Sequence, residues 1–138
     1  MHTCILVAND GDIYDVLYPW SSYDDSSSGR QPHAKFDWFG IGGRFEGALR
    51  LKQPRKLRKF FSLLPAGETR QACVAKKLEI AQQALLAEPP AALFFRGALY
   101  ESPLLADGQA LANWKAEFRE RFAEIPDDIT LQIVDAHS

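Results

Sequence analysis

The sequence predicts an α+β domain: a two-layer sandwich in which a mainly antiparallel sheet carries helices on one face, with a ferredoxin-like arrangement as the closest topology. Two observations predict this class. Apolar runs rich in strand-forming residues alternate with segments of helical periodicity, in the order strand, loop, strand, helix, strand, helix, strand. The length of 138 residues, with 46% hydrophobic and 25% charged, suits one globular domain over residues 1–138.

The N-terminal part of the chain predicts a strand, a short helix and a loop. Residues 3–8 (TCILVA) form a continuous apolar run that stops at NDGD, which indicates a buried strand followed by a turn. In residues 12–20 (DIYDVLYPW) the apolar side chains fit one face of a helix slightly better than a strand, and Pro19 limits either element. The polar, low-complexity segment near residues 21–33 predicts a mobile loop.

The middle of the chain predicts a strand, a helix and a second strand, in that order. Residues 44–51 (RFEGALRL) alternate in polarity, which favours a half-buried strand with Arg44 on the side away from the core. Helical spacing predicts a helix over residues 69–86, with Thr69 as its N-cap. Residues 93–100 are rich in aromatic side chains between proline boundaries and predict a strand.

The C-terminal part predicts a second helix and a last strand. The helix follows Asp107, ends at Pro126 and carries an apolar stripe. Residues 128–138 (DITLQIVDAHS) predict a strand, and its alternation places Asp135 and His137 on one side. The apolar stripe of the helix comprises Leu111, Trp114, Phe118, Phe122 and Ile125.

Composition argues against several classes of partner. With 16 basic and 18 acidic residues the formal charge is −2, so no global field favours nucleic acid or an anionic membrane. The two cysteines, Cys4 and Cys73, stand in no metal or redox motif and indicate buried thiols in a reducing compartment, hence the cytoplasm. The N-terminal apolar run is about five residues long, too short for a signal-peptide core or a membrane span. We expect no cofactor.

The stretch DWFGIGGRF, residues 37–45, is the most unusual part of the chain. Gly42 and Gly43 permit positive φ angles, so that backbone amides can form an anion-binding nest, and Arg44 adds a charged planar fork. The stretch is neither a Walker A loop nor a Rossmann fingerprint, since it lacks a GK[ST] ending and leads into a strand. The alternative is a structural bulge or bend over which Trp38 or Phe39 packs, with Arg44 in a salt bridge to a nearby acid.

The C-terminal Asp135 and His137 form the second candidate site. A carboxylate and an imidazole two residues apart on one side of a strand can hold a tautomer, accept a proton or ligate a metal; the alternative is a frayed strand end. A metal site is not expected, because only His2, His33 and His137 are present and no HxxH spacing occurs. The basic run over residues 52–59 indicates a solvated face rather than a nucleic-acid contact.

Both candidate sites are similar to segments of a family of small proteins from bacteria and their phages. Departures are Phe36 and Phe45, where that family commonly has tryptophan, and Ala136, where it commonly has cysteine, which counts against thiol chemistry. The resemblance implies that the glycine-arginine turn and the Asp-His terminus belong together. The matching residues are Lys35, Phe36, Asp37, Trp38, Phe39, Gly42, Gly43, Arg44, Phe45, Val134, Asp135 and His137.

The leading functional hypothesis is a binding module. The turn from Asp37 to Arg44 is expected to lie against the end of the last strand. Amides of Gly42 and Gly43 and the guanidinium of Arg44 would hold an anionic small molecule, nucleotide- or phosphate-like, on which Trp38 stacks.

Two further hypotheses belong to other classes. One is an enzyme of hydrolase or transferase type, in which His137 acts as general acid or base, Asp135 orients it and Arg44 stabilises developing negative charge. The other is an inhibitor or immunity-type protein that binds a host protein through exposed aromatic side chains or helices.

Overall fold

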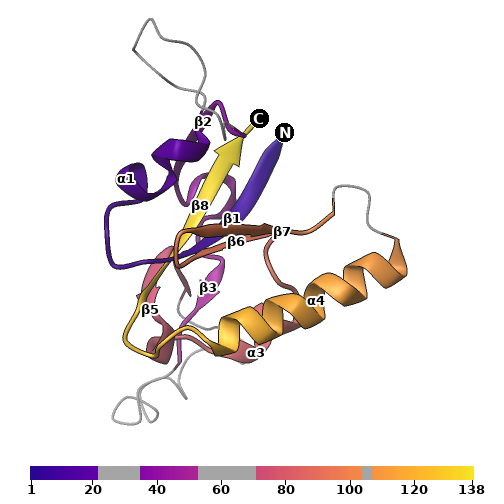
Figure 1. The fold of residues 1–138 in the computed structure, drawn as a ribbon. Helices are drawn as coiled ribbons and strands as arrows, with labels where there is room; N and C mark the ends of the chain where they lie inside the picture. The colour runs from indigo at the N-terminus through magenta and orange to yellow at the C-terminus, as the bar shows by residue number, and fades with distance from the viewer. Residues whose placement is uncertain (22–34, 53–70, 104–106) are drawn as a thin grey trace, which may run out of the picture.

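The computed structural model describes residues 1–21, 35–52, 71–103 and 107–138. Figure 1 shows their arrangement, with the first and last strands side by side and the two chain ends together. The elements, in chain order, are β1 (His2–Ala8), α1 (Ile13–Leu17), η1 (Tyr18–Trp20), β2 (Trp38–Ile41), η2 (Gly43–Phe45), β3 (Leu49–Arg50), β4 (Gln71–Ala72), β5 (Val74–Lys76), η4 (Lys77–Glu79), α3 (Gln82–Ala87), β6 (Ala92–Phe95), β7 (Ala98–Glu101), α4 (Gly108–Ala123) and β8 (Thr130–His137).

The main sheet has the order β2-β8-β1-β6-β7, and β5 also pairs with β8. The pair β1 and β6 is parallel and the other pairs are antiparallel. A separate two-stranded sheet is formed by β3 and β4. Mixed helix and strand content with a mostly antiparallel sheet confirms the α+β class.

Strand β8 organises the sheet because it is shared by three partners. One edge of β8 pairs with β1 from His2 opposite His137 to Ala8 opposite Leu131. Its other edge pairs first with β5 and then, nearer the chain end, with β2. Segments far apart in the sequence are thereby brought to the C-terminal end of one strand.

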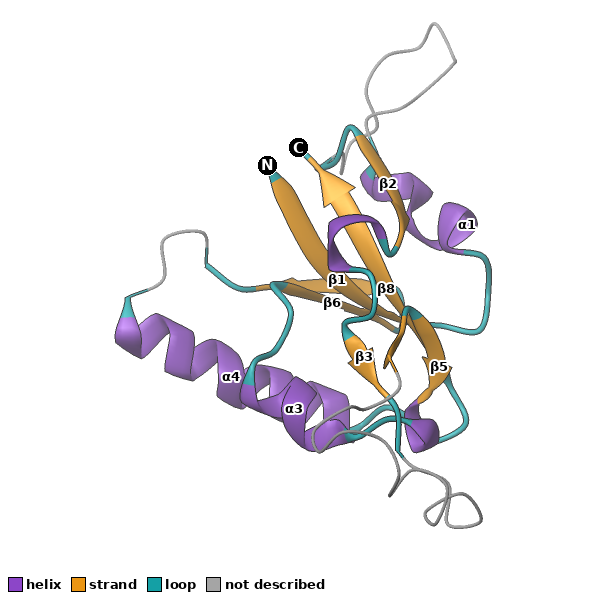
Figure 2. Ribbon diagram, turned by 180° about the vertical axis from the view of Figure 1, so that it is seen from behind, coloured by secondary structure: helices purple, strands orange, loops and turns teal. Residues whose placement is uncertain are grey.

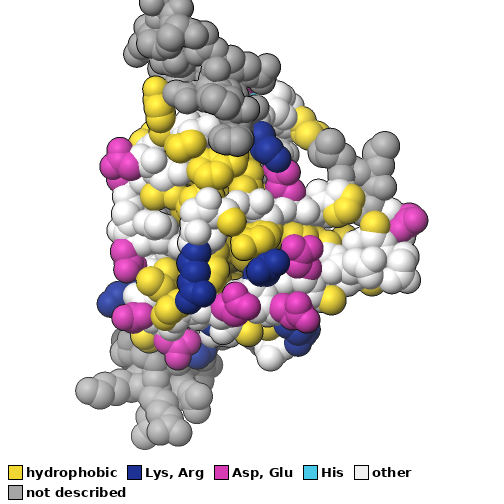
Figure 3. Space-filling model, viewed as in Figure 1, with side chains coloured by type: hydrophobic (Ala, Val, Ile, Leu, Met, Phe, Trp, Pro, Cys, Tyr) yellow, Lys and Arg dark blue, Asp and Glu magenta, His cyan; other side chains and the backbone are white. Residues whose placement is uncertain are grey.

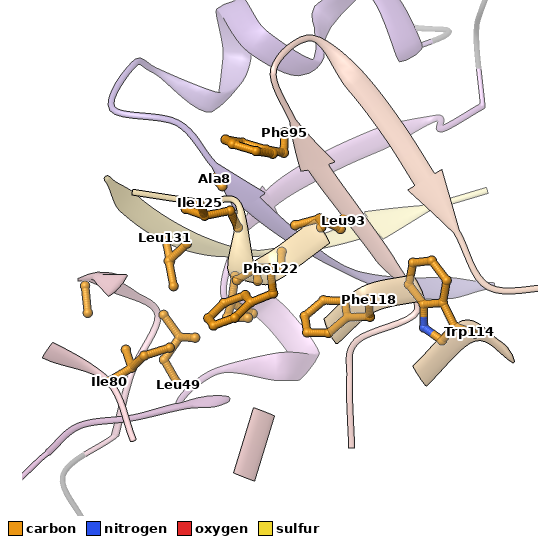
Figure 4. Packing of buried hydrophobic residues seen from close by; sticks show 13 residues of the cluster. Ala8, Leu49, Ile80, Leu93, Phe95, Trp114, Phe118, Phe122, Ile125 and Leu131 are labelled. Atoms are coloured by element: carbon orange, nitrogen blue, oxygen red, sulfur yellow. The ribbon is translucent and has the colours of Figure 1, made fainter. Parts of the chain in front are cut away.

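Both faces of this sheet are buried. On the first face, Trp114, Phe118 and Phe122 of α4 lie in one hydrophobic cluster with β1, β6 and β8 (Figure 4). On the second face, Ile13 and Leu17 of α1 lie in a second cluster that includes Ile5 and Val7 of β1. Burial of a long aromatic stripe removes a large apolar area from water, which is the main source of folding free energy.

This arrangement differs from the detailed fold expectation. Helical elements contact both faces of the sheet instead of one, since α1 and α4 belong to different clusters. The ferredoxin-like order is not confirmed: β6, the first strand of the β6–β7 hairpin, lies next to β1, where a ferredoxin-like sheet would have the second.

Four of the predicted elements are confirmed. They are the first strand, the short helix that ends near Pro19, the long second helix and the last strand, observed as β1, α1 with η1, α4 and β8. Helix α4 begins where expected because the Asp107 side chain accepts a hydrogen bond from the Ala110 N–H at 2.8 Å.

The strand predicted over residues 44–51 is wrong for most of its length. The structure has the short 3-10 turn η2 and then only the two residues of β3. Gly43 and Gly47 have φ angles of 55° and 75°, which bend the backbone away from an extended path. Arg44 is exposed, as expected, although it lies in a turn and not in a strand.

The helix predicted over residues 69–86 is also wrong. Within the described part, residues 71–72 and 74–76 are strands and only Gln82–Ala87 is α-helical. Val74 and Leu78, two of the apolar side chains whose helical spacing predicts this helix, are 47% and 48% exposed. Pairing of β5 with β8 overrides the helical spacing. Thr69 lies outside the described residues.

The strand predicted over residues 93–100 is a hairpin. Arg96 and Gly97, with φ angles of 51° and 77°, turn the chain between β6 and β7. Of the loop near residues 21–33, residues 22–33 are outside the described ranges, while Ser21 is buried. Of the basic run over residues 52–59, only Lys52 is described.

Figures 2 and 3 show the molecule from opposite sides. In the view of Figure 3, hydrophobic side chains form a patch between scattered lysine, arginine and acidic side chains. In the view of Figure 2, the turn η2 crosses over β8 between β2 and β3, with α3 and α4 at the opposite end of the molecule from the chain termini. The candidate residues lie on this second side, around β8 and η2.

Candidate functional site

Two histidines and a tryptophan lie in one row across three neighbouring strands. Antiparallel register places His137 of β8 opposite both His2 of β1 and Trp38 of β2. Opposed residues in adjacent strands point to the same face of a sheet, so the three rings share a face. We refer to His2, Trp38 and His137 as the imidazole–indole cluster.

The rings of this cluster are in mutual contact. His137 stacks on Trp38 with an interplanar angle of 2° and centroids 5.9 Å apart. His2 meets His137 edge to face at 5.1 Å and Trp38 at 5.8 Å. The indole is 45% exposed, so the cluster is accessible from solvent.

Asp135 holds the first histidine. Its Oδ1 lies 2.8 Å from Nδ1 of His2, and its Oδ2 accepts the backbone N–H of Arg44 at 3.0 Å. The Asp135 side chain is only 2% exposed. Burial alone would raise the pKa of this carboxyl, but the hydrogen bonds from Arg44 and His2, with the charges of both residues, lower it below its ordinary value. An ionised carboxylate only accepts hydrogen bonds, so the proton of this pair is on Nδ1 of His2.

Gly43, the second residue of the glycine pair, makes room for this carboxylate. A Cβ on Gly43, whose φ is +55°, would lie 2.6 Å from the Cβ of Asp135. The N–H of Gly42 donates to the carbonyl oxygen of Ile133 at 2.8 Å. The anion beside the turn is thus the protein's own Asp135, and the predicted donation from Gly42 to an external anion is replaced by a bond within the sheet.

His137 pairs with a different carboxylate from the one predicted. Nδ1 of His137 lies 3.1 Å from Oδ2 of Asp37, while Asp135 faces His2. The Asp37 N–H also donates to the His137 carbonyl oxygen at 2.6 Å. The side chains of His137 and Asp37 are 35% and 58% exposed, so this pair is open to solvent. The strand end does not fray, because β8 continues to His137.

Arg44 has two roles that can be separated. Its backbone N–H is used by Asp135, whereas its side chain is exposed and makes no ion pair within 4 Å with any carboxylate in the described ranges. The positive charge still contributes to lowering the pKa of Asp135. The predicted internal salt bridge of Arg44 is therefore not found in these ranges.

Gly40 lies between Trp38 and the turn, opposite Asp135. A Cβ built there would have no heavy atom within 4 Å, and its φ is not in the left-handed region. Neither crowding nor backbone strain therefore requires glycine at this position. The missing side chain leaves open space on the sheet face that Gly40 shares with Trp38.

One cavity is lined by a residue of the cluster, and another lies further along β1 and β8. A cavity of about 590 Å³ is lined by Cys4 and Ile133 from the sheet, by Arg50 of β3 and by residues of α3. A second of about 500 Å³ is lined by His2, Phe36 and the ion pair between Lys35 and Glu101. Burial, and then the negative charge of Asp135, raise the pKa of Cys4 to about 12, so the thiol at the first cavity stays protonated.

The structure brings the predicted residues Asp37, Trp38, Gly43, Arg44, Asp135 and His137 together at one end of β8, with Gly42 bonded to the same strand. The sequence reasoning missed His2 as a site residue. Pairing of the first strand with the last in antiparallel register would have placed it opposite His137. No group of three or more His, Cys, Asp or Glu side chains suited to a metal ion occurs in the described ranges.

Comparison of the chain with protein-family models, curated proteins and solved structures finds no match. The resemblance to a family of bacterial and phage proteins therefore stays a prediction. None of the helices in the described part has the length and apolar character needed to cross a membrane.

Proposed function

We propose that the chain binds an anionic small molecule, nucleotide- or phosphate-like, at the imidazole–indole cluster. The observation that supports this most directly is the exposed side chain of Arg44, without an ion pair in the described ranges, whose charge acts on the same Asp135 that pairs with His2 of the cluster. A planar guanidinium binds phosphate through two parallel hydrogen bonds, and an indole face accepts a flat base.

The binding groups differ from those of the initial hypothesis. The amide of Gly42 donates to Ile133 and that of Arg44 to Asp135, so side chains carry the proposed recognition. With neutral imidazoles, the charged groups around the cluster include the guanidinium of Arg44, which acts on Asp135, and the carboxylates of Asp37 and Asp135. An anion is therefore bound more tightly when the imidazoles are protonated, and affinity should be higher in mildly acidic than in mildly alkaline solution.

Calorimetric titration tests the proposal. Adenosine monophosphate and inorganic phosphate are titrated at about pH 6 and about pH 8, with neutral adenosine as the comparison. We expect the monophosphate to bind more tightly than phosphate alone, to weaken at the higher pH, and adenosine to bind weakly. Equal affinity for adenosine and its monophosphate would contradict anion recognition.

A matched pair of variants locates the binding. Arg44→Ala removes the guanidinium but keeps the backbone N–H that Asp135 uses. Arg119→Ala removes an equal charge from an exposed position on α4, at the other end of the molecule (Figure 2). We expect a loss of about tenfold or more in affinity for the first variant only, consistent with one charge-assisted contact. Equal losses in both would indicate a nonspecific charge effect.

The inhibitor or immunity-type hypothesis remains a prediction. Capture of one host protein with unchanged affinity in Arg44→Ala and His137→Ala variants would favour it over small-molecule binding. The enzyme hypothesis has a specific geometric observation in its favour: the Nδ1 atoms of His2 and His137 each face a carboxylate oxygen.

A further inference from the structure

We propose that the imidazole–indole cluster cleaves ribonucleotide phosphodiesters by transesterification, with His2 as the general base and His137 as the general acid. This inference rests on the proposed function, because the substrate's phosphate and base would occupy the site described for the anionic ligand. It adds a reaction to a binding event.

The arrangement of the two imidazoles supports it. Each Nδ1 faces a carboxylate oxygen, at 2.8 Å for His2 and 3.1 Å for His137. A histidine whose Nδ1–H is held in this way presents its Nε2 for proton transfer. The ring centroids are 5.1 Å apart, so one small substrate can reach both rings.

Transesterification needs two proton transfers and no other reactant. The neutral Nε2 of His2 takes the proton of the ribose 2′-hydroxyl as its oxygen forms a bond to phosphorus. The bond from phosphorus to the 5′-oxygen of the next nucleotide breaks, and the imidazolium of His137 protonates that leaving oxygen. The products are a 2′,3′-cyclic phosphate and a free 5′-hydroxyl, and proton exchange with water restores both histidines.

The assignment of roles follows from the two carboxylates. Asp135 is buried and fixed by the Arg44 N–H, so it stabilises the positive charge that His2 gains as a base. His137 and Asp37 are more exposed, which allows the acid to regain its proton from solvent. Asp135 is accordingly a positioning residue rather than a catalytic one.

Groups near the two histidines can contact the phosphate and the base of the substrate. The exposed Arg44 side chain supplies positive charge near the phosphate oxygens, where negative charge develops. The open space over Gly40, beside Trp38, offers room for a base against the indole. A leucine at position 40 would fill this space without meeting a neighbouring atom at its Cβ.

The first experiment measures cleavage of the dinucleotide uridylyl-adenosine as a function of pH. We expect a bell-shaped rate profile, because one histidine must be neutral and the other charged. Charged and titratable neighbours influence the acidic and alkaline sides of this profile. Around His2 they are Asp135, His137 and Arg44, and beside His137 it is Asp37. The ion pair of Lys35 with Glu101 and the Met1 amino group also lie near His2.

Asparagine variants isolate the reactive nitrogen. His2→Asn and His137→Asn keep an amide that can donate to the neighbouring carboxylate but remove Nε2. Each should lower the dinucleotide rate by about 10²–10⁴-fold, the usual contribution of general acid–base catalysis. The double variant, purified identically, sets the background from contaminating nuclease, and melting curves show that each variant is folded.

A second substrate separates the acid from the base. Uridine 3′-(4-nitrophenyl phosphate) releases nitrophenolate, a leaving group that needs no proton. His137→Asn should recover most of the wild-type rate on this substrate, whereas His2→Asn should not. Recovery by neither variant, or by His2→Asn alone, would overturn the assignment.

The positioning role of Asp135 has its own readout. Asp135→Asn can still accept the Arg44 N–H but presents an amide NH₂ to His2, which favours the opposite tautomer. We expect a lower kcat and an altered limb of the pH profile assigned to the base, with KM changed little. A variant with reduced stability and a wild-type profile would show a merely structural role.

The failure of this inference can be told from that of the proposed function. If the wild-type protein binds the dinucleotide by calorimetry but cleaves neither substrate above the double-variant background, the catalytic inference is wrong and the binding function stands. If it binds neither the dinucleotide nor adenosine monophosphate, both are wrong. The Gly40→Leu variant should lose affinity for the dinucleotide while keeping affinity for inorganic phosphate.

Discussion

Asp135 is the residue on which the local structure around η2 depends. A carboxylate that is almost fully buried has lost its water, and hydrogen bonds to charged groups are worth about 1.5–3 kcal/mol each. Asp135 has two such partners, the Arg44 N–H and His2. The contact that aligns the histidine therefore also holds the turn against β8.

The lowered pKa of Asp135 makes the folded protein sensitive to acid. Because the carboxyl ionises more readily in the folded protein than at its ordinary value of 3.8, the unfolded chain takes up the proton first as the pH falls. The stabilisation is present above that value and is lost as the pH falls through the pKa of the folded protein. Melting temperatures of the wild type and Asp135→Asn, measured between about pH 2 and about pH 7, should converge at the acid end.

Gly43 and Gly40 should respond oppositely to the same substitution. Gly43→Ala puts a Cβ 2.6 Å from the Cβ of Asp135 at a φ of +55°, and we expect a loss of at least about 2 kcal/mol. Gly40→Ala meets no atom within 4 Å and should change the free energy of unfolding by less than about 0.5 kcal/mol. Chemical denaturation measures both, and equal losses would contradict the close approach of Asp135 to the turn.

At this scale the sequence could indicate which residues matter but not how they pair. Alternation along one strand correctly placed Asp135 and His137 on one side. It could not show that each faces a carboxylate–imidazole partner from another strand, because partners across a sheet depend on strand order and register. His2 was missed for this reason, and Asp135 was assigned to the wrong histidine.

At the scale of elements, the C-terminal end of α4 is held by a buried lysine. Nζ of Lys77 donates to the carbonyl oxygens of Phe122 and Ile125 at 2.8 and 2.6 Å, and lies 4.7 Å from the centre of the Phe122 ring. Burial lowers the pKa of Lys77, partly offset by the charge of Asp127. A cation at this position complements the negative end of the helix dipole.

Replacing this lysine should destabilise the protein. Lys77→Met keeps most of the side-chain volume but leaves both carbonyl oxygens without the ammonium, so we expect a loss of about 1.5–3 kcal/mol. Lys115→Met, at an exposed position on α4, is the control and should change stability by less than about 0.5 kcal/mol. A neutral result for Lys77→Met would mean that the cost of burying the charge offsets its hydrogen bonds.

Elements were predictable where the pattern was long and had a clear boundary. Helix α4 extends over 16 residues with an N-cap, and β8 over eight, and both were expected. The region that contains β4, β5 and α3 was expected to be one helix, because short strands and turns can produce helical spacing by chance. The hairpin turn at Arg96 and Gly97 was missed because arginine seldom adopts a positive φ.

At the scale of the whole molecule, β8 is the strand with the most partners. It is hydrogen-bonded to β1 along one edge and to β5 and β2 along the other, and residues from 131 to 136 are buried. We expect its amides, with those of β1, to exchange hydrogen most slowly, and the amides of the small β3–β4 sheet to exchange faster. Hydrogen exchange followed by mass spectrometry measures this, and slower exchange in β3–β4 would contradict it.

The fold class could be predicted from the sequence, whereas the pairing of the strands could not. Counting strands and helices indicates an α+β protein, but the parallel neighbour of β1 and the position of β5 beside β8 follow from long-range pairing. Single-sequence periodicity contains no information on such pairing. The burial of both sheet faces could not be predicted either, because a strand covered on both sides lacks a clear alternation of polar and apolar residues.

The parallel stack of His137 on Trp38 gives the protein a built-in optical reporter. A protonated imidazole beside an indole quenches its emission, so light from Trp38 should follow the charge of the two histidines in contact with it, His137 and His2. The other two tryptophans lie elsewhere: Trp20 contacts Phe94, and Trp114 is buried against Phe118. A spectrum recorded during acidification, compared with that of Trp38→Phe, would thus display protonation within the imidazole–indole cluster without any added dye.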